Sequence, residues 1–304
     1  MTENEKYVFP FMRLKWVFIA ISVAFIVASI GLVIGKGLNF GVDFKGGIKL
    51  VYQFTRPIGD GEIRGMLGLK GFPDADVIRF GGEAENRYLV KTKFIADRNV
   101  SQEILAALQA LDPGASLISE ENVGPKVGAE LRRRGIFAII LAWILILVYI
   151  GIRFDFLFAP GGIVALIHDV TIPIGFFALF GKEVNLPILA ASLTIIGFSI
   201  NDTVVIFDRI RENLRKMPAS VPLARLIDIS LTETLSRTIV TSLTVLFVVV
   251  ILFLFGGGVI HDFAFFMIVG VFFGSYSTLF IASPIYLGLQ KMFPHHGMGR
   301  QKHK

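Results

Sequence analysis

Six long apolar runs, separated by polar segments, dominate the pattern of hydrophobic and polar positions along this chain. A helix needs about 20 apolar residues to cross the hydrocarbon core of a bilayer. The six runs are close to this length or exceed it, and they lie at residues 16–34, 135–152, 156–180, 186–208, 238–255 and 263–289. The pattern predicts a polytopic α-helical membrane protein with six transmembrane helices.

The first run follows Lys6, Arg13 and Lys15, so a cleaved signal peptide is the alternative interpretation of this segment. The apolar core of a signal peptide has about 7–15 residues and precedes a small-x-small cleavage site. This run is longer, and no clear cleavage site precedes Asn39. We therefore expect residues 16–35 to form an uncleaved first transmembrane helix.

The distribution of Lys and Arg predicts the orientation, because short cytoplasmic loops carry an excess of basic residues. One side would hold residues 1–15, Arg153, residues 209–236 and the basic tail 290–304, with thirteen basic residues in all if Arg237 is excluded. The short loops of the other side hold only Lys182. Both termini should be cytoplasmic in a bacterial inner membrane. The cluster Arg132–Arg134 opposes this assignment, but a long segment translocates largely regardless of its charge.

Residues 36–134 form a polar block between the first two runs, and we expect an extracytoplasmic domain there. Alternating apolar positions and turn residues divide this block into six elements. These are strands at 48–54, 75–80, 87–94 and 115–123, and helices at 60–70 and 99–111, the second opened by the capping-box pattern of Asn99 and Gln102. The order βαββαβ predicts a ferredoxin-like α+β domain. It has no His and no Cys, so a binding or mechanical role is favoured over catalysis, with a structural cap as the alternative.

Composition agrees with the membrane class and excludes several others. Hydrophobic residues make up 54% of the chain and charged residues 18%, with a mean hydropathy of +0.68. The net charge of +6 comes from residues that flank apolar runs, so the expected partner surface is the lipid bilayer and not nucleic acid. There is no cysteine, and the nearest pattern to a phosphate loop, Gly175–Lys182, has the wrong spacing. We expect no cofactor, no metal site and no catalytic residue.

Three apolar runs contain ionisable residues, and such residues usually mark ion or substrate pathways because each costs about 2.5–3.5 kcal/mol to insert. Asp202 lies in the fourth run, near the face that carries Ser192 and Ser199. Arg237 begins a polar stripe in the fifth run, and His168 precedes Asp169 in the third. Each also has an interpretation without a functional role. These are helix packing for Asp202, snorkelling to the surface for Arg237, and a structural role for His168 and Asp169.

Two of these residues are expected at a similar depth in the membrane. The fourth run would end, and the fifth begin, on the cytoplasmic side, so Asp202 and Arg237 both lie in the inner half of the membrane. An ion pair between them is geometrically available. Arginine does not lose its proton in proteins, whereas an aspartate that gains and loses an arginine partner changes its proton affinity. Asp202 and Arg237 are therefore the principal candidates for proton coupling, and Asp169 is a further one because Pro173 leaves its backbone carbonyl free for a water.

Several segments, in this order, resemble the signatures of the SecD/SecF family of protein-export membrane proteins, which belongs to the resistance-nodulation-division superfamily. They are Gly41–Gly47, Val123–Leu131, Ala191–Asn213, Glu233–Ser242 and Leu254–Gly257. The resemblance covers about residues 10–290. It implies a heterodimer with a SecD subunit that assists SecYEG and SecA, associates with YajC, and uses the proton gradient to draw unfolded polypeptide outward. It also implies that Asp202, the acid of the motif Asn201-Asp202-Thr203, and Arg237 take part in proton passage. Asn201 and Thr203 are further candidates because they flank the acid.

Two of these segments flank the insertion and form the expected structural motif of the chain. The first contributes Asp43, Gly46 and Gly47, and the second contributes Gly124, Pro125 and Gly128. The glycines ahead of the first strand favour a sharp exit from the membrane. A binding role for Asp43 is the alternative.

Three functions follow from these observations. The leading hypothesis is a proton-coupled accessory subunit of protein export, which is not an enzyme in the usual sense. The second is an autonomous proton-coupled exporter of small molecules or lipids. The third is a structural scaffold for the translocation channel.

Overall fold

A computed structural model describes residues 8–80, 85–95, 98–154 and 156–293. The expected turn at Gly81-Gly82 and most of the basic tail lie outside the described residues. Six helical segments in the described part are long and apolar enough to cross a membrane. The prediction of six transmembrane helices is therefore confirmed at the level of helix length and composition.

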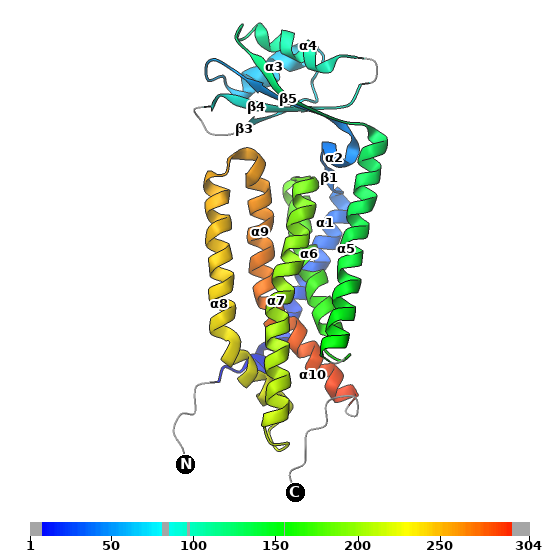
Figure 1. Cartoon of the computed structure of the whole chain (residues 1–304), viewed down its shortest axis with the longest axis vertical. Helices are drawn as coiled ribbons and strands as arrows, with labels where there is room; N and C mark the ends of the chain where they lie inside the picture. The colour runs from blue at the N-terminus through cyan, green and yellow to red at the C-terminus, as the bar shows by residue number, and fades with distance from the viewer. Residues whose placement is uncertain (1–7, 81–84, 96–97, 155, 294–304) are drawn as a thin grey trace.

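These segments form a bundle beneath a small sheet domain (Figure 1). Five are single helices: α1 (Phe11–Lys36), α5 (Pro125–Arg153), α6 (Ala159–Phe180), α7 (Leu186–Lys216) and α8 (Leu223–Phe255). The sixth consists of α9 (Gly257–Ser277), a π-helical turn η2 (Thr278–Ala282) and α10 (Ser283–Met292). Helix α1 begins, and α10 ends, at the end of the bundle away from the sheet (Figure 1).

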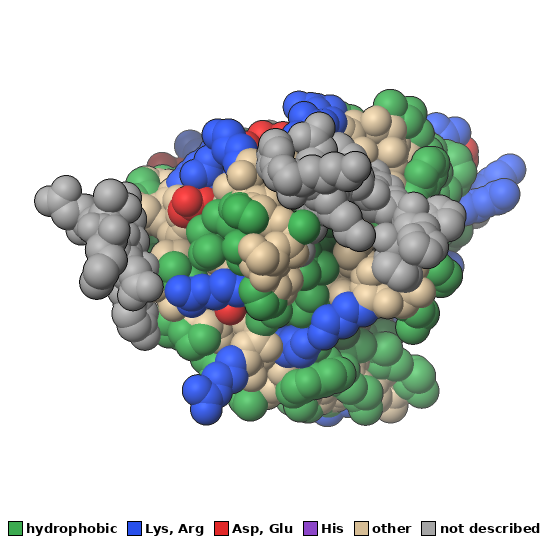
Figure 2. Space-filling model, turned by 90° about the horizontal axis from the view of Figure 1, so that it is seen from below, with side chains coloured by type: hydrophobic (Ala, Val, Ile, Leu, Met, Phe, Trp, Pro, Cys, Tyr) green, Lys and Arg blue, Asp and Glu red, His purple; other side chains and the backbone are tan. Residues whose placement is uncertain are grey.

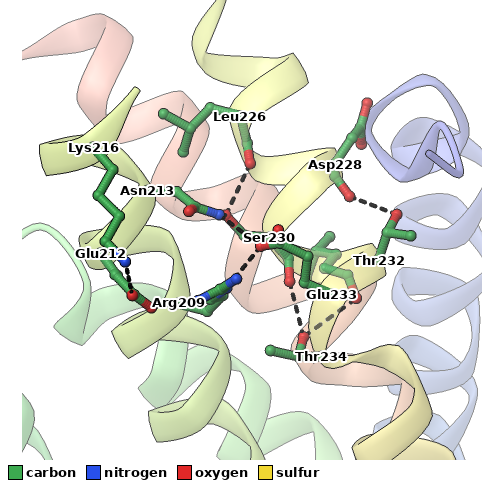
Figure 3. Close-up of polar contacts among 11 residues, drawn as sticks. Arg209, Glu212, Asn213, Lys216, Leu226, Asp228, Ser230, Thr232, Glu233 and Thr234 are labelled. Atoms are coloured by element: carbon green, nitrogen blue, oxygen red, sulfur yellow. Dashed lines mark hydrogen bonds and ion pairs between the residues drawn. The ribbon is translucent and has the colours of Figure 1, made fainter. Parts of the chain in front are cut away.

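Helices α7 and α8 extend well beyond the membrane runs, so the expectation of a loop at 209–236 is wrong. Side-chain contacts across the two extensions explain the difference, since Arg209 donates to Glu233 at 2.7 Å and Asn213 donates to Ser230 at 3.0 Å (Figure 3). Only residues 217–222 separate the two helices. The hydropathy pattern predicts only the apolar part of a helix that lies in lipid. It does not predict a polar extension of the same helix beyond the membrane.

The same extension of α8 holds the start of α1. Asp228 is buried and accepts a hydrogen bond of 2.8 Å from the backbone N–H of Met12. The first N–H groups of a helix have no partner within the helix, and a carboxylate there also complements the helix dipole. Helix α1 is thereby capped by a residue more than 200 positions away in the chain.

The segment between α1 and α5 folds into the expected order of elements. They are β2 (Gly47–Gln53), α3 (Asp60–Leu69), β3 (Asp76–Phe80), β4 (Arg87–Thr92), α4 (Val100–Gln109) and β5 (Ser116–Val123). The strands pair antiparallel in the order β3-β4-β2-β5, which is the split βαβ arrangement. Helices α3 and α4 cover one face, and the other face is turned toward the bundle (Figure 1). Asn99 caps α4 by accepting from the N–H of Gln102 at 3.3 Å.

Three short elements connect the domain to the bundle, and none was predicted. Strand β1 (Asn39–Phe40) pairs in parallel with β6 (Glu183–Val184), in the loop between α6 and α7. Between β1 and β2 lies the one-turn helix α2 (Val42–Lys45). Two-residue strands leave no periodic pattern, so hydropathy alone could not find them.

Candidate functional site

Asp202 lies inside the bundle on α7, with 7% of its surface exposed. One carboxylate oxygen, Oδ1, accepts a hydrogen bond of 2.8 Å from the hydroxyl of Thr238 on α8. The other oxygen, Oδ2, is buried and has no hydrogen-bond partner in the part of the chain that the structure describes. A buried polar atom without a partner costs about 1–3 kcal/mol, so this oxygen marks a site where a proton or a further partner would be stabilising.

Arg237 is adjacent to Thr238 on α8, but its side chain is exposed. Among the described residues it forms no ion pair with Asp202. The sequence-based pairing is thus possible by position but is not formed in this conformation. Asn201 is also exposed, on the adjoining face of α7.

A second carboxylate, Asp169 on α6, is completely buried and has partners for both oxygens. Its Oδ1 lies 2.8 Å from Nδ1 of His168, which is also completely buried. Its Oδ2 accepts hydrogen bonds from Ser199 at 2.5 Å and from Ser277 at 2.9 Å. Helices α6, α7 and α9 therefore converge on one carboxylate.

The Asp169 network extends to α1 through an aromatic hydroxyl. Nε2 of His168 lies 3.1 Å from the hydroxyl of Tyr276, which lies 2.6 Å from the hydroxyl of Ser22. Tyr276, Ser277 and Ser22 were not predicted from the sequence as functional residues. The run of four hydroxyl residues from Ser275 to Thr278, inside an otherwise apolar segment, was the signal that could have found the first two.

Thr203 connects α7 to the π-helical turn. Its hydroxyl donates to the carbonyl of Ser199 at 2.9 Å and lies 3.0 Å from the hydroxyl of Thr278, the first residue of η2. Isolated π-helical turns are frequent at functional sites. One turn of α7 thus carries Ser199, which contacts Asp169, together with Asp202 and Thr203.

The two segments that flank the insertion contact one another. A Cβ added to Gly128 would lie 2.8 Å from the backbone nitrogen of Gly46, and one added to Gly46 would lie 2.7 Å from Cα of Pro125. Gly46 also has a φ of +83°, which favours glycine. A Cβ on Gly47 would lie 2.6 Å from the carbonyl oxygen of Thr92. These close backbone contacts explain why glycine is required at positions 46, 47 and 128 of the motif.

Gly124 and Pro125 begin α5. Gly124 is the N-cap residue, and Pro125 occupies the first helical position, where the missing N–H costs no hydrogen bond. A Cβ on Gly124 would meet nothing within 4 Å. Asp43 of the facing segment is buried and contacts both Lys49 and the start of α7.

Comparisons with known proteins identify the family. A family model described as "Protein export membrane protein SecD/SecF, C-terminal" matches residues 103–292, and one described as "SecD/SecF GG Motif" matches residues 31–58. The protein translocase subunit SecF of Desulfurispirillum indicum is 41% identical over 288 residues, covering 91% of this chain and 90% of that protein. The subunit SecF of Vibrio alginolyticus is 41% identical over 285 residues, covering 92% and 90%.

A longer relative and its structure give the same result. The protein translocase subunit SecDF of Thermus thermophilus is 38% identical over 259 residues, which cover 84% of this chain but 35% of that protein. The crystal structure of SecDF, a translocon-associated membrane protein from Thermus, superposes with a TM-score of 0.81 at 35% identity, covering 96% of this chain and 40% of that one. The resemblance drawn from the sequence motifs is confirmed: the chain belongs to the SecD/SecF family of protein-export membrane proteins.

Proposed function

We propose that this chain acts as the SecF-type subunit of a SecD–SecF complex, in which a proton gradient drives late steps of protein export. The observation that carries the proposal is the carboxylate of Asp202, buried in an apolar helix with one oxygen unpartnered among the described residues. A group in this environment gains from protonation, and it becomes easier to ionise whenever the nearby Arg237 approaches. Alternation between these two states would couple proton passage to helix movement.

A second subunit is supported by the polar surface of the bundle. Asn201, Arg237 and Thr244 are exposed on α7 and α8 within the apolar spans. Polar side chains at this depth almost always face protein or a water-filled cavity, so a partner's helices should cover this face. The chain also spans 40% of the SecDF structure that it resembles, which leaves room there for a second half. A SecD subunit is the expected partner, with SecYEG, SecA and YajC as associated components.

The proposed orientation places the sheet domain outside the cytoplasm and both termini inside. Basic side chains lie on the end of the bundle opposite the sheet (Figure 2). Arg153 ends α5, and Arg211 and Lys216 lie in the last two turns of α7. This agrees with the excess of Lys and Arg in cytoplasmic loops. The unfolded exported polypeptide would then meet the sheet domain after it leaves the channel.

The Asp169 network is a second candidate element of proton coupling. It differs from the Asp202 site because both of its carboxylate oxygens have partners, one of them the ring of His168. Ser199 and Thr203 connect the two sites through a single turn of α7. A change in the protonation of Asp169 would therefore alter its contact with Ser199 and could displace α7, the helix that carries Asp202.

Replacing Asp202 by Asn tests the proposal, because the amide keeps the shape and can still accept from Thr238 but cannot release a proton. Asp208→Asn is the matched control, since Asp208 lies on the same helix and is exposed. We expect export of a secreted reporter and gradient-dependent proton flux to fall in Asp202→Asn and to be retained in Asp208→Asn. Unchanged export and flux in Asp202→Asn would favour a scaffold. Purification of the chain with only copies of itself would favour an autonomous exporter.

A further inference from the structure

Asp43 lies in α2, where the sheet domain and the start of α7 come together. Its carboxylate is buried, with 3% of the residue exposed. Oδ2 accepts a hydrogen bond of 3.0 Å from the backbone N–H of Leu186, the first residue of α7. Oδ1 accepts from the ammonium group of Lys49 in β2. The two oxygens of one side chain thus join a membrane helix to the central part of the sheet.

The start of α7 depends on this contact. Its N-cap residue, Asn185, accepts from the N–H of Ile188 at 3.2 Å, and Pro187 has no N–H to satisfy. The N–H of Leu186 receives its acceptor from Asp43, a residue outside the helix. A carboxylate at this position also faces the positive end of the helix dipole. Asp43 is therefore bound to α7 by both a hydrogen bond and charge.

Contacts around Asp43 hold the same two parts together. The backbone N–H of Gly41 donates to the carbonyl of Val184 at 2.9 Å, and β1 pairs with β6. Lys91 of β4 forms an ion pair of 2.6 Å with Glu183, just ahead of α7. The loop before α7 is thus attached to β2 through Asp43 and to β4 through Glu183.

Helix α7 also carries the proposed proton site. Asp202 lies sixteen residues beyond Leu186 in one continuous helix, a rise of about 24 Å. A continuous helix of this length moves largely as a rigid unit, so a displacement of α7 at Asp202 also displaces Leu186. Movement of the helix start then acts directly on Asp43.

We infer that Asp43 is the positioning residue that transmits movement of α7 to the sheet domain. This inference rests on the proposed function, because it takes the movement to originate at Asp202. The two contacts of Asp43 convert an axial or tilting displacement of α7 into a displacement of β2.

The test uses the full chain assembled with its SecD-type partner in membrane vesicles. Amide hydrogen exchange in β2 and in the first turn of α7 is compared with and without Asp202→Asn. We expect Asp202→Asn to alter exchange in both places when Asp43 is present. In an Asp43→Ala background it should alter exchange in α7 but leave β2 unchanged. Proton flux should be retained in Asp43→Ala with Asp202 intact, while reporter export falls several-fold.

Two further variants separate transmission from loss of folding. Lys49→Met keeps the cap on α7 and removes the contact to β2, so it should show the same loss of transmission. Because it leaves Oδ1 of the buried Asp43 unpartnered, it should also lower the melting temperature without preventing folding. Glu121→Gln is the control, since Glu121 is an exposed second partner of Lys49 at 3.7 Å and should have no effect.

Two results would overturn the inference. In the first, the Asp202→Asn effect still reaches β2 in both Asp43→Ala and Lys49→Met. In the second, Asp202→Asn leaves β2 unchanged when Asp43 is present. Failure of the proposed function appears separately, as unchanged export and proton flux in Asp202→Asn.

Discussion

Thr238 donates a hydrogen bond of 2.8 Å to Asp202 and is that carboxylate's one hydrogen-bond partner among the described residues. The bond crosses from α8 to α7. It also places Arg237, the preceding residue on α8, beside the proposed proton site without an ion pair. Thr238 therefore controls both the hydrogen bonding of Asp202 and the alignment of the helix that carries the nearest cation.

Thr238→Val should impair export, because it leaves both buried oxygens of Asp202 without a partner at nearly constant volume. The loss of one hydrogen bond to a buried group costs about 1–3 kcal/mol, and here it also changes the environment of the proton site. Thr238→Ser keeps the hydroxyl and should retain most activity. Reporter export measured across a range of pH checks this. Equal activity and equal pH profiles of the two variants would exclude Thr238 from the site.

Tyr276→Phe should destabilise the bundle, because it removes the hydroxyl between Ser22 and the completely buried His168. An unpartnered ring nitrogen at this depth should lower the free energy of unfolding by about 1–3 kcal/mol. Thermal unfolding in detergent measures the effect. Tyr149→Phe is the matched control, since Tyr149 is 48% exposed on α5 and should tolerate the same change. A melting temperature like that of the control would show that the network contributes little.

Gly128→Ala should be destabilising by about 1–3 kcal/mol, because its added methyl group would overlap the backbone at Gly46. Backbone cannot move aside as a flexible side chain can. Gly124→Ala lies one turn earlier in the same segment and meets nothing within 4 Å, so it should be tolerated. The amount of folded protein in the membrane and its melting temperature compare the two. The same outcome for both variants would mean that the flanking segments do not depend on close packing.

Asp112 should make the sheet domain less stable at low pH. The backbone N–H of Thr55, which donates to it at 2.7 Å, is the main cause that lowers the pKa of this carboxyl, and the Thr55 hydroxyl and the N–H of Gly114 act in the same direction. A lowered pKa in the folded state contributes stability that is complete above the ordinary value of about 3.9. That stability is lost as the pH falls through the lower, folded-state pKa.

Amide exchange of Thr55 and Gly114 as a function of pH measures this contribution. Asp112→Asn should be less stable near neutral pH and should lose the extra acid sensitivity. Asp74→Asn serves as the control, because the one ion pair of Asp74 within the described residues is an exposed contact with Lys93. If the stability of Asp112→Asn falls at low pH as much as that of the unmodified chain, another group is responsible for the acid sensitivity.

Hydropathy and turn residues predicted much of the architecture for definite physical reasons. A helix in lipid is predominantly apolar over about 20 residues, so the six spans are visible without knowledge of tertiary contacts. The strands of the domain alternate because one face packs on α3 and α4, as Leu50 and Tyr52 illustrate with no exposed surface. The extension of α8 back to Leu223 is held by polar contacts to distant residues, which no local pattern reports.

The site was predictable only in part, because it depends on which helices touch. Asp202 and Asp169 stood out as acids in apolar runs. Their partners Thr238 and Ser277 are ordinary hydroxyl residues of membrane helices, and only the packing gives them a role. Depth along the membrane predicts Arg237 and Asp202 at a similar level, but depth does not determine rotation about the helix axis. That rotation leaves the guanidinium exposed.

The strand order has a consequence for biosynthesis. Strand β2, the first strand of the four-stranded sheet in sequence, pairs with both β4 and β5, and β5 runs through Gly124 directly into α5. The sheet therefore cannot close until the last strand of the insertion has been made and delivered to the same side of the membrane as the first. The residues that follow directly in the chain are those of α5. Folding of the domain and membrane insertion of the second span are thus consecutive events. A variant that delays one should leave the nascent chain open to proteolysis at the other.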